Sequence, residues 1–185
     1  MSDVPELIVS KLDAARRQLE TAIRLYFHGG DPVSIHTLTG AAYQLIRDIN
    51  AKRGGAPMMI KEHFVRLFKP EDIPAVTRKL NEAQNFFKHA DGDSSETLAF
   101  RPSQTEMLLL DACLKYRELS GELVPAFGVY QAWFMIAVGR ALILPSHLAQ
   151  IRQDAQRAFP KGRQAFFAEC LPLANDLGLP NLNNG

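Results

Sequence analysis

The chain has 185 residues, with 21 basic and 20 acidic side chains and a formal net charge of +1. This length supports one well-buried core, so we predict a single helical domain over residues 1–177 and a flexible tail over 178–185. The balanced charge argues against a polycationic coat for nucleic acid or for a membrane surface, although a small local patch is compatible with it.

The N-terminus and the cysteines indicate the compartment. Asp3 and Glu6 make the start of the chain acidic where a secretory signal is basic, so we expect a cytoplasmic protein. Cys113 and Cys170 lie far apart among apolar neighbours, which predicts reduced, buried thiols rather than a disulfide.

In the N-terminal part, apolar residues recur at helical spacing. We predict a first helix from near Pro5, with Asp3 as its N-cap, to the stop at residues 28–30. Asp31 and Pro32 then begin a second helix as N-cap and first helical residue. A turn this short places two long helices antiparallel.

The middle of the chain predicts a short helix over 58–68 and a longer one from Ile73 to about Ala90. The longer helix has a buried stripe and a polar stripe. Its polar stripe ends at Asn85 and His89, just before Asp91-Gly92-Asp93. In the second helix, Gly40 and its alanine neighbours are small enough for another helix to approach closely.

The C-terminal half predicts further helices over 103–119, 123–144 and 145–159, a break at 160–162 and a last short element around Phe166. Ser103 and Glu106 suggest a capping box. Asp111 is a carboxylate on an apolar helix. We predict that it pairs with Lys115, the alternative being that it faces a pocket.

These patterns predict an all-α fold, a helical bundle built on a long antiparallel helix hairpin. No alternating β pattern of useful length is present in the sequence. Residues 123–144 approach the length of a membrane span, but helix-breaking and polar residues interrupt them, which favours a core helix without membrane contact. Tyr130, Trp133 and Phe134 are expected in the core or at a dimer interface.

Residues 31–48 (DPVSIHTLTGAAYQLIRD) and 85–91 (NFFKHAD) carry a family resemblance. They resemble a group of uncharacterised, all-helical bacterial proteins that are similar to the HEPN superfamily, named for nucleotide binding in higher eukaryotes and prokaryotes. The resemblance extends to about Phe100. It implies a HEPN-like helical fold, a homodimer, and a nucleotide or RNA as ligand.

Many HEPN proteins are metal-independent ribonucleases that carry an arginine, then a polar residue, often asparagine, and then a histidine a few residues later. In this chain Asn85 and His89 match, but Gln84 stands at the arginine position. An amide lacks the charged fork that would hold a phosphate. The resemblance therefore implies the fold and the dimer more strongly than RNA cleavage. The residues expected to bind a ligand are His36, Tyr43, Arg47, Gln84, Lys88 and Asp91.

Three functions remain open from the sequence. The leading one is a non-catalytic, HEPN-like protein that binds a nucleotide or nucleic-acid ligand. The first alternative is an endoribonuclease with His89 as acid or base and Asn85 in a positioning role. The second is a structural or partner-binding helical protein, in which His89 only caps its helix.

A metal site is a further hypothesis for the end of this helix. His89, Asp91, Asp93 and Glu96 supply suitable ligand types, with His36 as an additional one. The sequence Asp-Gly-Asp-Ser-Ser is ordinary turn chemistry, however. We therefore expect neither a metal nor another cofactor.

Overall fold

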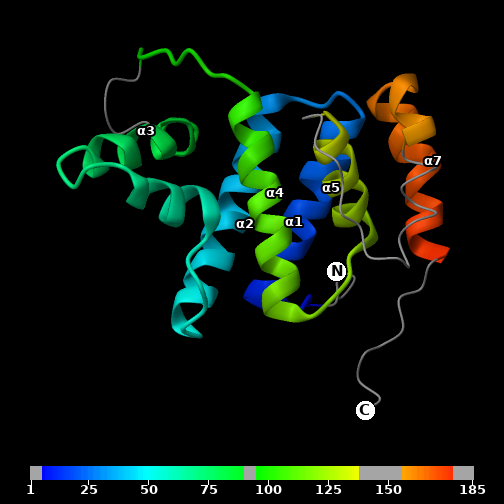
Figure 1. Cartoon of the computed structure of the whole chain (residues 1–185), viewed down its shortest axis with the longest axis horizontal. Coiled ribbons are helices and arrows are strands. Elements are labelled where there is room, and N and C mark those ends of the chain that lie inside the picture. The colour runs from blue at the N-terminus through cyan, green and yellow to red at the C-terminus, as the bar shows by residue number, and fades with distance from the viewer. Residues whose placement is uncertain (1–5, 90–94, 138–155, 177–185) are drawn as a thin grey trace, which may run out of the picture.

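A computed structural model describes residues 6–89, 95–137 and 156–176 of the chain. The fold is all-helical, as predicted. The helices that lie side by side in a bundle (Figure 1) are α1 (Lys11–Phe27), α2 (Pro32–Lys52), α4 (Ser103–Ser120), α5 (Pro125–Ala137) and α7 (Arg163–Asp176). Within the described ranges, no helix is both long and apolar enough to cross a membrane.

An arm projects from one side of the bundle (Figure 1), and its helix α3 carries Gln84 and Asn85 of the predicted site. It consists of the π-helical turn η1 (Met59–His63), the 3-10 turn η2 (Phe64–Leu67) and helix α3 (Ile73–Phe86). Helix α3 comes close to α2 at Gly40, where a Cβ atom would lie 3.1 Å from the Gln84 side chain. The predicted close approach at this glycine is confirmed.

Helices α1 and α2 form the expected hairpin. Gly29 ends the turn region of α1 with φ of +70°, a left-handed conformation that glycine adopts without a steric penalty. The carboxylate of Asp31 accepts a hydrogen bond from the Ser34 amide at 2.7 Å and caps α2, and Pro32 is its first residue. Local turn chemistry therefore reverses the chain here.

The first helix begins later than predicted. Its N-cap is Ser10, whose hydroxyl accepts a hydrogen bond from the Asp13 amide at 3.0 Å. Ile8, which we expected in the buried stripe, is 95% exposed. The Ser10 cap prevails because it satisfies an otherwise unpaired N–H and because Asp13 adds a negative charge to the first turn. Asp3 lies outside the described residues.

The end of α3 and the start of α4 also differ from the prediction. Helix α3 ends at Phe86 rather than near Ala90. The capping box is wrong, because Ser103 is already helical, its side chain forms no cap, and Glu106 accepts a hydrogen bond from the Tyr26 hydroxyl instead.

The C-terminal part agrees with the prediction where it is described. Gly162 has a φ of +92° after the 3-10 turn η4 (Phe159–Lys161), so the predicted break before α7 is confirmed. The predicted helical segments over 138–155 and the tail from 177 lie outside the described residues. Cys113 and Cys170 are both buried and form no disulfide, as expected.

The core of the bundle is aromatic and centres on Phe27. Its ring stacks on that of Phe167 at a centroid distance of 4.7 Å and contacts Tyr130 and Trp133 edge-on. The expectation that Tyr130 and Trp133 belong to the core is confirmed. Because α1, α5 and α7 all contribute to this cluster, it joins helix α1 to the two C-terminal helices α5 and α7.

Phe27→Ala should therefore reduce the free energy of unfolding by about 3–5 kcal/mol, since it removes a ring that is 1% exposed and leaves a cavity. Phe64→Ala is the matched control, because Phe64 is 44% exposed and should change stability much less. Urea denaturation followed by circular dichroism measures both. Equal losses for the two variants would contradict the assignment of Phe27 to the core.

Candidate functional site

A buried carboxylate, Asp111 of α4, links the bundle to the arm. It is 3% exposed and accepts hydrogen bonds from the Tyr43 hydroxyl at 2.6 Å and from the amides of Met59 and Ile60 at 3.1 and 2.9 Å. The predicted pairing with Lys115 is wrong, because Lys115 bonds to Glu118 and to a backbone carbonyl. Asp111 instead supplies the acceptor for the unpaired amides at the start of η1.

Tyr43 extends this link toward the next residue of the turn. Its hydroxyl donates to Asp111 and also accepts a hydrogen bond from the Lys61 amide at 3.2 Å. Burial and the neighbouring carboxylate raise the pKa of Tyr43, so the phenol keeps its proton. The backbone of Lys61 is thereby held against α2.

The Lys61 side chain is buried among neutral partners. Its ammonium donates to the side-chain oxygens of Asn81 at 2.8 Å and Gln84 at 2.7 Å, both on α3, and lies 5.4 Å from the Tyr43 ring centroid. In the described part of the chain this ammonium forms no ion pair. A buried cation without a carboxylate is costly, so its place in the fold requires an explanation.

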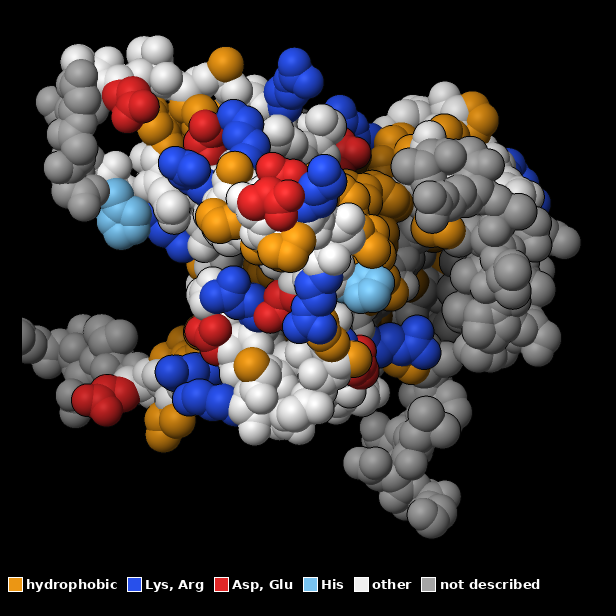
Figure 2. Space-filling view, turned by 60° about the vertical axis from the view of Figure 1, so that its left-hand side comes forward, with side chains coloured by type: hydrophobic (Ala, Val, Ile, Leu, Met, Phe, Trp, Pro, Cys, Tyr) orange, Lys and Arg blue, Asp and Glu red, His pale blue; other side chains and the backbone are white. Residues whose placement is uncertain are grey.

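Two more cations lie close enough to act on Lys61 electrostatically. Burial, together with the charges of Arg47 and Lys88, lowers the pKa of Lys61 to about 8. We call Arg47, Lys61 and Lys88 the Lys61 cluster. It is a local feature, because on the face drawn in Figure 2 basic and acidic side chains are interspersed.

His36 lies beside this cluster and is almost completely buried. Its Nδ1 atom is 2.9 Å from the Thr105 hydroxyl, and the edges of Phe87 and Phe100 contact its ring. Its Nε2 atom has no hydrogen-bond partner among the described residues. Burial, followed by the charges of Lys61 and Lys88, lowers the pKa of His36 to about 4, so this imidazole is neutral near pH 7.

The structure brings together only part of the predicted site. His36, Tyr43 and Gln84 are buried, and Arg47 and Lys88 lie near them. Gln84 uses its amide group within the fold, since it donates to the Gly40 carbonyl at 3.3 Å and accepts from Lys61. Asp91 lies outside the described residues.

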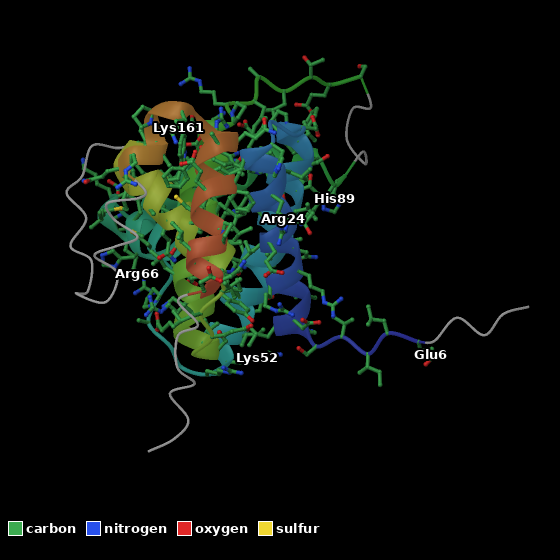
Figure 3. All side chains as sticks on the ribbon, turned by 90° about the vertical axis from the view of Figure 1, so that its right-hand side faces the viewer. Glu6, Arg24, Lys52, Arg66, His89 and Lys161 are labelled. Atoms are coloured by element: carbon green, nitrogen blue, oxygen red, sulfur yellow. The ribbon has the colours of Figure 1, made fainter. Side chains whose placement is uncertain are left out.

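Asn85 and His89 do not share a buried recess with His36 and Tyr43. Both are exposed, and Figure 3 shows His89 at the margin of the molecule. The side chain of His89 forms no hydrogen bond with another described residue. Helix α3 ends earlier than expected, so His89 follows the helix instead of extending its polar stripe.

Lys61 is the central residue that the sequence did not indicate. It lies on a short, irregular turn, for which no helical period reveals a buried face.

A metal site was a further hypothesis from the sequence. The described residues contain no group of three His, Cys, Asp or Glu side chains that could hold an ion. Asp91 and Asp93 of the metal hypothesis fall outside those residues.

Fold and site define an all-helical protein in which a buried polar network joins a bundle to a lateral arm. No family model matches the chain, and no match is found among curated proteins or solved structures. The resemblance to the HEPN superfamily therefore stays a prediction, and function is inferred from the geometry around Lys61.

Asp111→Ala should lower the free energy of unfolding by about 3 kcal/mol or more, because the hydroxyl of Tyr43 and two buried amides then lack an acceptor. Asp72→Ala is the control, since this exposed side chain caps no helix. Chemical denaturation compares the two variants. If Asp111→Ala is as stable as Asp72→Ala, the proposed link between bundle and arm is wrong.

The buried imidazole predicts a pH dependence of stability. The unfolded chain binds a proton at His36 as the pH falls below about 6.5, whereas the folded chain binds it only near pH 4. The free energy of unfolding should therefore fall by on the order of 3 kcal/mol between pH 6.5 and 4. His36→Gln should remove this contribution.

Urea denaturation at several pH values measures the effect, with the exposed His89→Gln as the control for a histidine outside the core. The difference in stability between wild type and His36→Gln should change steadily across this pH window. If the free energies of unfolding of wild type and His36→Gln vary in parallel with pH, the assignment of this pH dependence to His36 is wrong.

Proposed function

We propose that the protein binds a phosphate-bearing ligand, a nucleotide or a short nucleic-acid segment, at the Lys61 cluster. The observation that carries this proposal is the buried ammonium of Lys61, whose hydrogen-bond partners are two neutral amides. A phosphate would supply the missing negative charge next to Lys61 and would also be attracted by Arg47 and Lys88.

The small number of cations limits the size of the ligand. Three cations with a chain net charge of +1 favour contact with a few phosphates rather than with a long duplex. The resemblance of residues 31–48 and 85–91 to the HEPN superfamily supports a nucleotide or RNA over other anions. Neutral His36 beside the cluster avoids a further buried charge when the site is empty.

The resemblance also supports a homodimer as part of this proposal, and we place this homodimer in the cytoplasm on the grounds of the sequence. The turn η2 exposes apolar side chains, with Leu67 72% exposed and Phe64 packed edge-on against Phe68. Exposed apolar patches are typical of contact surfaces between proteins. The buried thiols of Cys113 and Cys170 are compatible with a reducing compartment.

Catalysis is the weaker alternative. Cleavage of RNA needs a cation and an acid or base at the same phosphate. Here Gln84 at the arginine position is tied into the fold, and the imidazole of His89 is exposed. These features favour binding without cleavage.

Lys61→Met should weaken binding of ATP and of a short single-stranded RNA by about tenfold or more, because it removes the central charge. Lys69→Met is the matched control, since Lys69 is exposed on the same arm and should leave binding unchanged. Isothermal titration calorimetry at two salt concentrations measures both, and affinity should fall at higher salt. Equal affinities of Lys61→Met and Lys69→Met for these ligands would contradict the proposal.

The same RNA, incubated with wild-type protein in chelator, should stay intact. If the wild type cleaves the RNA, and the cleavage is lost in His89→Ala but kept in Lys69→Met, the protein is a ribonuclease that uses His89. That result would contradict the proposal of binding without cleavage. If neither ATP nor RNA binds to the wild type, the structural or partner-binding function becomes the better description.

A further inference from the structure

A pocket of about 240 Å³ lies among the ends of α1, α2, α4 and α7, apart from the Lys61 cluster. Residues Ile35 and Leu109 give it an apolar wall, and Tyr26, Thr105, Glu106 and Arg163 give it a polar one. Pockets for drug-sized ligands have volumes of about 300–1,000 Å³. This pocket therefore suits a molecule smaller than a nucleotide.

Two charges of opposite sign line the pocket from different helices. Arg163, the first residue of α7, places its guanidinium 4.7 Å from the centroid of the Tyr26 ring. Glu106, in the first turn of α4, accepts a hydrogen bond from the Tyr26 hydroxyl at 3.2 Å. Neither charge forms an ion pair with another described residue.

Tyr26 contacts both of these charged side chains. Its hydroxyl accepts a hydrogen bond from the Trp133 indole at 3.1 Å and donates to Glu106, so both of its roles are assigned. Its ring is 8% exposed and packs edge-on against Phe27 and Tyr130. Tyr26, the side chain that both charges contact, is therefore part of the core, so binding would not need to order it.

We propose that this pocket binds a free α-amino acid. The carboxylate would lie at the guanidinium of Arg163, whose planar fork suits two oxygen atoms. The ammonium would lie at Glu106, and the side chain would face Ile35 on the apolar wall. A simple anion would be repelled by Glu106 and a simple cation by Arg163, whereas a zwitterion satisfies both charges.

Calorimetric titration of the wild-type protein with each of the common L-amino acids tests the proposal. At least one should bind. Its N-acetyl derivative, which lacks the ammonium, and its amide, which lacks the carboxylate, should each bind about tenfold more weakly or worse. The proposal is overturned if no amino acid binds at millimolar concentration, or if both blocked derivatives bind as well as the free amino acid.

Variants assign each charge to its partner group. Arg163→Gln should bind the free amino acid and its amide equally, because the partner of the carboxylate is gone. Glu106→Gln should bind the free amino acid and its N-acetyl derivative equally, because the partner of the ammonium is gone. The controls are Arg66→Gln and Glu71→Gln, which are exposed on the arm and should keep the wild-type preference. Circular dichroism confirms that each variant is folded.

This site is independent of the one proposed for phosphates, so Lys61→Met should still bind the amino acid. Amino-acid binding that is lost in Lys61→Met but kept in Arg163→Gln would also overturn the proposal, because it would place the ligand at the Lys61 cluster.

Discussion

Hydrogen-bond donors from two distant parts of the chain converge on the Asp111 carboxylate, which is buried in α4. The Tyr43 hydroxyl comes from α2, and the amides of Met59 and Ile60 come from η1. A buried carboxylate needs such donors, and the amides at the start of a helical turn need an acceptor. The buried carboxylate thus receives the hydrogen bonds that it needs, and the amides receive an acceptor. These hydrogen bonds fix where the arm leaves the bundle.

The position of Lys61 follows from this constraint. Because η1 is held at both Asp111 and Tyr43, the Lys61 side chain is directed toward α3, where Asn81 and Gln84 accept its hydrogen bonds. Gln84 in turn donates to the Gly40 carbonyl of α2, so the network closes on the bundle. The cation is thus built into the junction of arm and bundle, where neutral amides rather than a carboxylate accept its hydrogen bonds.

The sequence predicted those parts of the fold that depend on local chemistry. The hairpin of α1 and α2 follows from Gly29, Asp31 and Pro32, which act within a few residues of one another. The partners of Asp111 could not be found in this way, because Tyr43 and Met59 are 68 and 52 residues away in sequence. Lys115, one turn along the same helix, was the only local partner that the pattern offered.

The candidate site was predicted in part for the same reason. His36 and Tyr43 lie on one face of the regular helix α2, so their common environment could be inferred from periodicity, and both are buried. The exposure of Asn85 and His89 depends on where α3 ends, and helix ends are the least certain feature of a periodic pattern. Lys61 could not be identified, because its burial results from the anchoring of η1 by residues of other helices.

The position of Gln84 connects the fold to the proposed chemistry. An arginine there would carry a charged fork on α3, whereas Gln84 accepts a hydrogen bond from Lys61, whose ammonium lies 2.7 Å away. The positive charge thus comes from the arm's first turn and lies in a buried network, while the imidazole of His89 is exposed. With the cation and the imidazole in different environments, the geometry supports the proposal that the chain holds a phosphate without cleaving beside it.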